Sequence, residues 1–138
     1  MKKTLFIICA LALFAGACKK DKTPALTPIQ ILTNNMVGLW KYDSESNQYF
    51  DPNGVPDQPD KSFFVNSSIE FKSTGEEIVI LNGGAPTVAS WQVLSGTTFK
   101  LGTTTYTVKT ITATSFIYTS ETVAEDNSKT VITYSLSR

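Results

Sequence analysis

Few side chains in this 138-residue chain could take part in chemistry. The sequence contains no histidine, which removes the commonest general base and the commonest metal ligand. Its two cysteines, Cys9 and Cys18, both lie among the first 18 residues, so the rest of the chain can form no disulfide and no thiolate metal site. No glycine-rich phosphate loop is present. We therefore expect a protein that is not an enzyme and that binds no metal or cofactor.

Oxygen ligands are concentrated in one proline-rich segment, residues 51–60. Asp51, Asn53, Asp57 and Asp60 could in principle bind Ca²⁺, which prefers oxygen ligands in flexible loops. The spacing is not that of an EF-hand, because Ser62 stands where that loop has its final glutamate. We interpret the segment as a solvated loop.

Further carboxylates lie near predicted turns. A pair of carboxyl groups can hydrolyse glycosides when the two face each other across a cleft, but nothing in the spacing indicates such a pair. We interpret these carboxylates as surface residues. They are Glu76, Glu77, Glu121, Glu125 and Asp126.

Cys18 follows a segment with the features of an export signal. Two lysines near the N-terminus precede an apolar run over residues 5–14. That run is too short to span a bilayer as a helix but has the length of a signal-peptide core. Small residues at 15–17 then lead directly to Cys18.

This segment resembles the lipobox of bacterial lipoproteins, although Ala15 stands where leucine is usual. The resemblance implies that residues 1–17 are a lipoprotein signal peptide and that Cys18 carries a diacylglycerol and a further acyl chain such as palmitate, which together anchor the protein to a membrane. Because Lys19 rather than aspartate follows, the sorting rule of these lipoproteins implies the outer membrane, on its periplasmic or its surface-exposed face. The alternative is an ordinary secretory signal cleaved near Ala17.

The charge balance excludes one class of partner. Basic and acidic residues both number 12, and removal of the signal with its two lysines would leave a weakly acidic chain. Such a chain is poorly suited to nucleic acid or to anionic lipid headgroups. We therefore expect membrane contact through the N-terminal lipid alone, with residues 18–27 as a polar tether.

The remaining residues, 28–138, are enough for one domain. Thr27, Pro28 and Gln30 form a helix-start pattern, with an N-cap, a proline at the first helical position and a capping box. This pattern predicts a short helix over residues 28–35 that covers one end of the domain.

From Leu39 onward the composition favours strands, because Thr, Val, Ile, Phe and Tyr dominate and turn signals recur about every eight to twelve residues. The predicted strands cover 39–43, 62–72 with a break near 66–67, 76–81, 88–94, 98–101, 103–112, 114–123 and 129–137. Their sequential order predicts an all-β fold, an antiparallel up-and-down meander of about eight strands that closes fully or partly into a small barrel. A two-sheet sandwich is the alternative.

Several short motifs occur in a recognisable order. The predicted helix runs into Gly38-Leu39-Trp40, a strand and glycine turn follow over 69–75 (IEFKSTG), Trp91 lies at mid-chain, and the chain finishes with the strand VITYSLSR. This order resembles the small lipocalin-like lipoproteins of Gram-negative bacteria. The resemblance implies a lipocalin-like barrel over residues 28–138 and a binding role.

The resemblance also implies a role for the Gly-x-Trp motif. In lipocalins this tryptophan closes one end of the barrel beneath the ligand cavity, a role that falls here to Trp40, and Gly38 lets the helix-to-strand turn pack against it. In full lipocalins a late arginine crosses the tryptophan by a cation–π contact. Arg138 is the only arginine and the last residue of the sequence, so we expect it to fray rather than to make this contact.

Aromatic side chains could line an apolar pocket inside the barrel. The candidates are Trp40, Phe71, Trp91, Phe99, Tyr106, Phe116, Tyr118 and Tyr134. They could equally fill the core, because side chains can occupy the whole interior of an eight-stranded barrel. We predict a monomeric, non-catalytic module for a small hydrophobic or amphiphilic ligand. The alternative is an envelope scaffold with a filled core and no small-molecule ligand.

Overall fold

The computed structural model describes residues 24–138, so the predicted signal peptide, Cys18 and most of the tether lie outside the described residues. The described elements are α2 (Pro28–Met36), β1 (Gly38–Phe50), β2 (Asp60–Phe63), β3 (Ser68–Phe71), β4 (Glu76–Ile80), β5 (Thr87–Val93), β6 (Thr98–Leu101), β7 (Thr104–Ile111), β8 (Ser115–Val123) and β9 (Lys129–Ser137). Within residues 24–138, no helix combines the length and the apolar character needed to cross a membrane.

Eight of these strands form a closed antiparallel barrel. From β3 to β9 each strand pairs with the next along the chain, and β1 pairs with both β3 and β9, which closes the ring. β2 lies outside the ring and pairs only with the segment Ser44–Asn47 of β1. The predicted up-and-down barrel is therefore confirmed, with one additional strand, and the two-sheet sandwich is excluded. The arrangement is compatible with a lipocalin-like fold.

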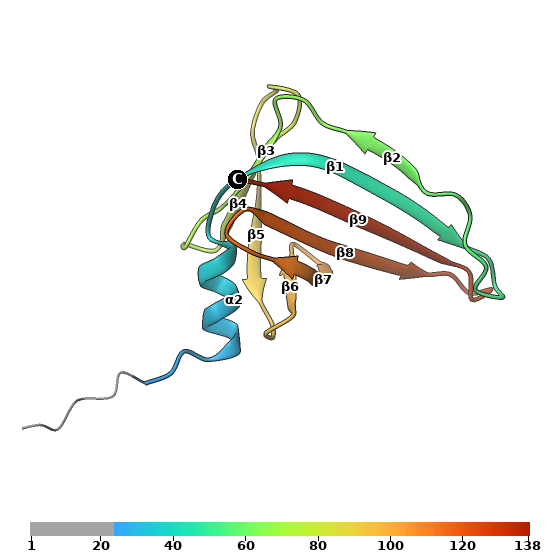
Figure 1. The fold of residues 1–138 in the computed structure, drawn as a ribbon, viewed down its shortest axis with the longest axis horizontal. Coiled ribbons are helices and arrows are strands. Elements are labelled where there is room, and N and C mark those ends of the chain that lie inside the picture. Colours follow the sequence, from blue (N-terminus) through green and yellow to red (C-terminus); the bar gives the residue numbers. More distant parts are fainter. Residues whose placement is uncertain (1–23) are drawn as a thin grey trace, which may run out of the picture.

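The barrel is asymmetric because its strands differ in length. β1 has 13 residues and β8 and β9 have nine each, whereas β3, β4 and β6 have four or five. Figure 1 shows β1, β9 and β8 running side by side beyond the short strands, with β2 along the outer edge of β1. One side of the barrel wall is thus much taller than the other.

The prediction that the first strand ends at Asp43 was wrong, because β1 continues to Phe50. A β-bulge between Tyr42 and Ser44 shifts the register with β9. A bulge inserts one residue and so moves the side-chain alternation by one position. Beyond it Glu45 lies opposite Tyr134, and the polar residues that follow lack the alternating apolar pattern by which a buried strand is found.

Helix α2 closes one end of the barrel. Its predicted capping box is present: the Gln30 amide donates to the Thr27 hydroxyl at 3.2 Å, and the Thr27 amide donates to the Gln30 side chain at 2.8 Å. Leu32 and Met36 are buried in the core. The Trp40 indole donates to the Met36 carbonyl at 2.8 Å, which ties the start of β1 to the end of the helix.

Arg138 completes this closed end, and the expectation that it would fray was wrong. Its guanidinium carbon lies 3.6 Å from the centroid of the Trp40 ring. The same group donates to the carbonyls of Val37, at 2.7 Å, and Met36 and Leu39, each at 3.3 Å. These charge-assisted bonds and the cation–π contact offset the entropy lost by ordering a terminal side chain.

Gly38 makes room for that guanidinium. Its φ angle is +122°, a conformation that residues with a Cβ rarely adopt. A Cβ at this position would also lie 2.9 Å from Nη2 of Arg138. Glycine is therefore required both by the backbone turn and by the arginine packed on it.

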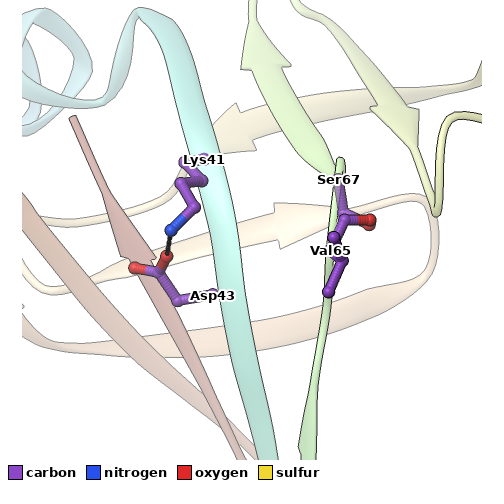
Figure 2. A network of polar contacts seen from close by, with 4 residues as sticks. All are labelled: Lys41, Asp43, Val65 and Ser67. Carbon is purple, nitrogen blue, oxygen red and sulfur yellow. Dashed lines mark hydrogen bonds and ion pairs between the residues drawn. The ribbon is translucent and has the colours of Figure 1, made fainter.

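Ser67 fixes the bend between β2 and β3. Its hydroxyl donates to the Val65 carbonyl at 3.2 Å and accepts from the Asn82 amide at 2.8 Å, which joins this bend to the β4–β5 turn. Figure 2 shows Ser67 and Val65 on this connection beside β1, where Lys41 and Asp43 form a 2.8 Å ion pair. Lys41 and Asp43 alternate with the inward-facing Trp40 and Tyr42, so this pair lies on the outer face of the barrel.

The half of the barrel next to α2 is filled with aromatic rings. Trp40, Phe71, Phe99 and Phe116 are completely buried. Their centroids are 5.5 Å apart for Trp40 and Phe116, 5.9 Å for Phe99 and Phe116, and 6.1 Å for Phe71 and Phe99. Edge-on and tilted contacts at these distances stabilise a solid core, so any space for a ligand must lie in the other half.

Candidate binding site in the barrel mouth

A cavity of about 420 Å³ opens at the barrel end opposite α2. Each of the eight barrel strands contributes at least one lining residue. They are Tyr42, Ile69, Glu77, Val79, Leu81, Ala89, Leu101, Gly102, Thr103, Thr104, Tyr106, Tyr118 and Tyr134. The cavity is therefore the mouth of the barrel, and its volume lies in the range of small-molecule sites.

Four tyrosines, Tyr42, Tyr106, Tyr118 and Tyr134, form a continuous aromatic surface in this mouth, and we call them the mouth tyrosines. Tyr118 and Tyr134 stack with centroids 4.9 Å apart, and Tyr106 meets them edge-on at 5.4 and 5.6 Å. Tyr42 joins this group through Tyr134, at 6.4 Å. Strand pairing sets the arrangement, because Tyr118 and Tyr134 are directly opposite each other on β8 and β9 and therefore point to the same face.

The mouth tyrosines are neutral at physiological pH. Burial raises the pKa of Tyr106 to about 12 and the pKa of Tyr118 well above its usual value of 10. Burial likewise raises the pKa of Tyr42, whose hydroxyl donates to Oε2 of Glu45 at 3.0 Å. Tyr42 and Tyr118 are buried, so the neutral aromatic surface open to a ligand comes mainly from the partly exposed Tyr106 and Tyr134.

Glu77 is the charged residue in the lining, and its side chain is only 4% exposed. It lies opposite Phe71 on β3 and Ala89 on β5, so it points into the barrel as Phe71 does. Burial raises the pKa of Glu77 to about 7, and no hydrogen bond or ion pair with another described residue offsets that burial.

The interpretation of Glu77 as a surface residue was therefore wrong, whereas its neighbour Glu76 is exposed. Successive residues of a strand point to opposite faces. In a strand that reads Glu-Glu-Ile-Val-Ile, one of the two glutamates has to face inward, and this alternation is the signal that could have identified Glu77.

Several of the other carboxylates considered from the sequence make local contacts. Oδ1 of Asp51 accepts from the amides of Asn53 and Val55, at 2.9 and 2.8 Å, and so closes its own loop. Glu121 forms a 3.4 Å ion pair with Lys129. In the part of the chain that the structure describes, no group of three or more His, Cys, Asp or Glu residues could hold a metal ion.

The eight aromatic residues predicted as candidates fall into two groups. Tyr106, Tyr118 and Tyr134 line the mouth. The other five, Trp40, Phe71, Trp91, Phe99 and Phe116, are buried in the filled half of the barrel, and Tyr118 belongs to the same buried cluster while also lining the mouth. Within that half, Trp91 packs edge-on against Phe71 and donates its indole N–H to the Lys72 carbonyl at 3.0 Å.

Sequence reasoning missed two lining residues with functional side chains, Tyr42 and Glu77. Tyr42 could have been found by alternation, since it stands two residues after Trp40 and faces the same way. The small or aliphatic lining residues, such as Ala89 on β5, have no signal of their own, because only the barrel register brings them to the mouth.

The fold and the site together define a closed eight-stranded antiparallel barrel with one filled end and one open, tyrosine-lined end. No protein-family model matches the sequence, and comparison with curated proteins and with solved structures likewise gave no match.

Proposed function

We propose that this protein is a non-catalytic binding module that holds a small amphiphilic ligand in the barrel mouth, and that it acts as a monomer. The observation that carries the proposal is the cavity of about 420 Å³ lined from all eight barrel strands. Its walls combine apolar side chains with a few polar groups, as small-molecule sites do.

The contrast between the two halves of the barrel supports this proposal. Inward positions near α2 carry large rings, whereas the inward position on β5 in the mouth carries Ala89, which remains exposed. An aromatic residue there would occupy the space and extend the packed core. The mouth is therefore left open by the choice of side chain as well as by the short strands.

The membrane assignment is part of the same proposal. We infer a lipocalin-like lipoprotein of the outer membrane, anchored through Cys18, from the lipobox resemblance and from the Gly38, Trp40 and Arg138 arrangement at the closed end. Residues 24–27 lead into α2 at that closed end. A lipid attached upstream would leave the mouth at the opposite end of the barrel, open to ligand.

A blocked mouth tests the binding role. In the full chain carrying Cys18→Ser, the neutral fluorophore N-phenyl-1-naphthylamine should bind at one site with a saturable rise in fluorescence. Ala89→Phe should abolish that rise, because the new ring fills the mouth. Val88→Phe is the matched control: Val88 is the adjacent β5 residue, it is exposed, and it faces outward. An unchanged titration for Ala89→Phe, or no binding at all, would refute the proposal.

One observation favours the alternative, an envelope scaffold that docks through its surface. β2 is a free edge strand, and Phe63 at its end is 73% exposed, with Val65 beside it at 70%. An exposed apolar edge can pair with another chain. If this role were the main one, Phe63→Ser would abolish function in cells while Ala89→Phe would leave it intact.

A further inference from the structure

Glu77 is a buried carboxylate for which the described part of the chain supplies no counter-charge. The residue is 4% exposed and lines the mouth. Its carboxylate opens into that cavity, because the described residues contain no fully buried side-chain oxygen that lacks a hydrogen-bond partner. Burying an unpaired carboxylate is costly, and folded proteins normally pair it with a cation or with hydrogen-bond donors. Among the residues that line this cavity there is no lysine or arginine. A bound cation would offset the free energy lost when the Glu77 carboxylate is removed from water.

The surroundings of Glu77 favour a positively charged partner. Burial raises the pKa values of Tyr106 and Tyr118, and the charge of Glu77 raises both further, which places these two hydroxyl groups near the carboxylate. A second carboxylate, Glu45, lies at the rim and accepts from the Tyr42 hydroxyl. The mouth therefore carries negative charge with no lysine or arginine in its lining to neutralise it, a field that attracts cations.

The mouth tyrosines add a second kind of attraction for a cation. Organic ammonium groups bind to the faces of aromatic rings, and cages of several rings are a recurrent site for them. Here the four rings have neighbouring centroids 4.9 to 6.4 Å apart in the same cavity as Glu77. Tyr42 and Tyr118 are buried, so Tyr106 and Tyr134, which are partly exposed, provide the ring surface that a cation can reach. Ring faces and carboxylate together fit a cationic head better than a neutral or an anionic one.

We propose that the ligand of the barrel mouth is an organic cation, an ammonium group on an apolar body, and that the ammonium lies between Glu77 and the mouth tyrosines. The apolar body packs on the aliphatic wall formed by residues such as Ile69, Val79 and Leu101. This inference rests on the proposed function, because it names the ligand class for the same cavity.

Three probes of equal chain length isolate the charge of the head group: octylammonium, 1-octanol and octanoate. Each is tested for displacement of N-phenyl-1-naphthylamine from the full chain carrying Cys18→Ser at pH 8, below its solubility limit and, for the two charged probes, below the micelle concentration. We expect octylammonium to bind about tenfold or more tightly than 1-octanol, since a charge-assisted hydrogen bond is stronger than a neutral one, and octanoate to bind no better than 1-octanol.

Two glutamine variants locate the source of the preference. Glu77→Gln keeps the size of the side chain and removes its charge, so most of the preference for octylammonium over 1-octanol should be lost, with only the smaller contribution of the rings and of Glu45 remaining. Glu76→Gln is the matched control, because it makes the same change on the exposed face of the same strand, and the tenfold preference should survive it.

The failures are distinguishable. Displacement by all three probes without a preference for octylammonium, or a preference that is undiminished in Glu77→Gln, overturns the cation inference and leaves the binding role standing. Tighter binding of octanoate than of octylammonium likewise overturns the cation inference and leaves the binding role standing. Absence of displacement by every probe removes the binding role, and the cation inference with it.

Discussion

Glu77→Gln should change how the stability of this protein depends on pH. The ordinary pKa of a glutamate is 4.5, and burial raises the pKa of Glu77 to about 7. As the pH rises from 4.5 to 7, the unfolded chain releases this proton and the folded chain holds it. The free energy of unfolding therefore falls as the pH rises through this window. Below pH 4.5 Glu77 is protonated in both states and does not lower the stability of the fold.

The size of the effect follows from the displacement of the pKa. At about 1.36 kcal/mol for each pKa unit, the ionised form of Glu77 costs the folded state about 3 kcal/mol once the pH exceeds 7. Of this, about 2.5 kcal/mol develops between pH 5 and pH 8. Small domains have a free energy of unfolding of roughly 5–15 kcal/mol, so the change is a large fraction of the total. Glutamine has no proton to lose and should escape it.

Urea denaturation at pH 5 and pH 8, followed by the fluorescence of the buried Trp40 and Trp91, measures this difference. Relative to the wild type, Glu77→Gln should gain about 2.5 kcal/mol on going from pH 5 to pH 8, which corresponds to roughly 1–2 M urea in the midpoint. Glu76→Gln, which alters an exposed neighbour, should show no such gain.

Equal pH dependence of the wild type and Glu77→Gln would refute the reasoning. It would mean that Glu77 titrates as it does in the unfolded chain, and hence that its carboxylate is solvated in the folded protein. A gain shared by Glu76→Gln would assign the effect to net charge instead of burial. The comparison uses differences between variants, so other titrating groups cancel.

Three further outcomes are expected. Arg138→Ala should lower the free energy of unfolding by about 2–3 kcal/mol in urea denaturation, because it removes a cation–π contact with Trp40 and three bonds to carbonyls; a change below 0.5 kcal/mol would contradict the closed-end geometry. In fluorophore displacement, octylammonium should bind about tenfold or more weakly at pH 5.5 than at pH 8, because Glu77 gains its proton on acidification. The mouth tyrosines stay neutral over this range. The same titration on Glu45→Gln separates any contribution from the rim carboxylate. In a Gram-negative host, metabolic labelling with an alkyne fatty acid should mark the protein through Cys18, and label retained in Cys18→Ser would defeat the lipobox assignment.

Alternation and turn residues were sufficient to predict most of the barrel. The strands over 98–101 and 129–137 were predicted at their observed bounds, and the capping box at Thr27 placed the helix correctly. These are local signals, set by side-chain periodicity and backbone capping. The bulge after Tyr42 has no comparable signal, because it arises from the pairing of β1 with a distant strand. The shift in alternation that it causes is why the second half of β1 was not predicted.

The site was less accessible to sequence reasoning than the fold. The aromatic residues were correctly placed on inward faces, but their division between core and mouth depends on their height along the barrel axis, which the register alone determines. Glu77 was taken for a surface residue since carboxylates are rarely buried. Arg138 was misjudged because the carbonyls that hold it, such as that of Val37, lie about a hundred positions earlier in the chain.

The pairing of β1 with β9 has a consequence for how the protein reaches its folded state. The register that seals the ring pairs residues as far apart as Lys41 and Ser137, which are 96 positions apart in the sequence. Contacts between such distant segments form slowly, because a long loop must be closed before they stabilise the chain. Until then β1 and β9 each present an unpaired edge, open to association with other chains. The interval before the ring closes is therefore the stage at which this protein is most exposed to aggregation, and a chaperone that shields either edge would act there.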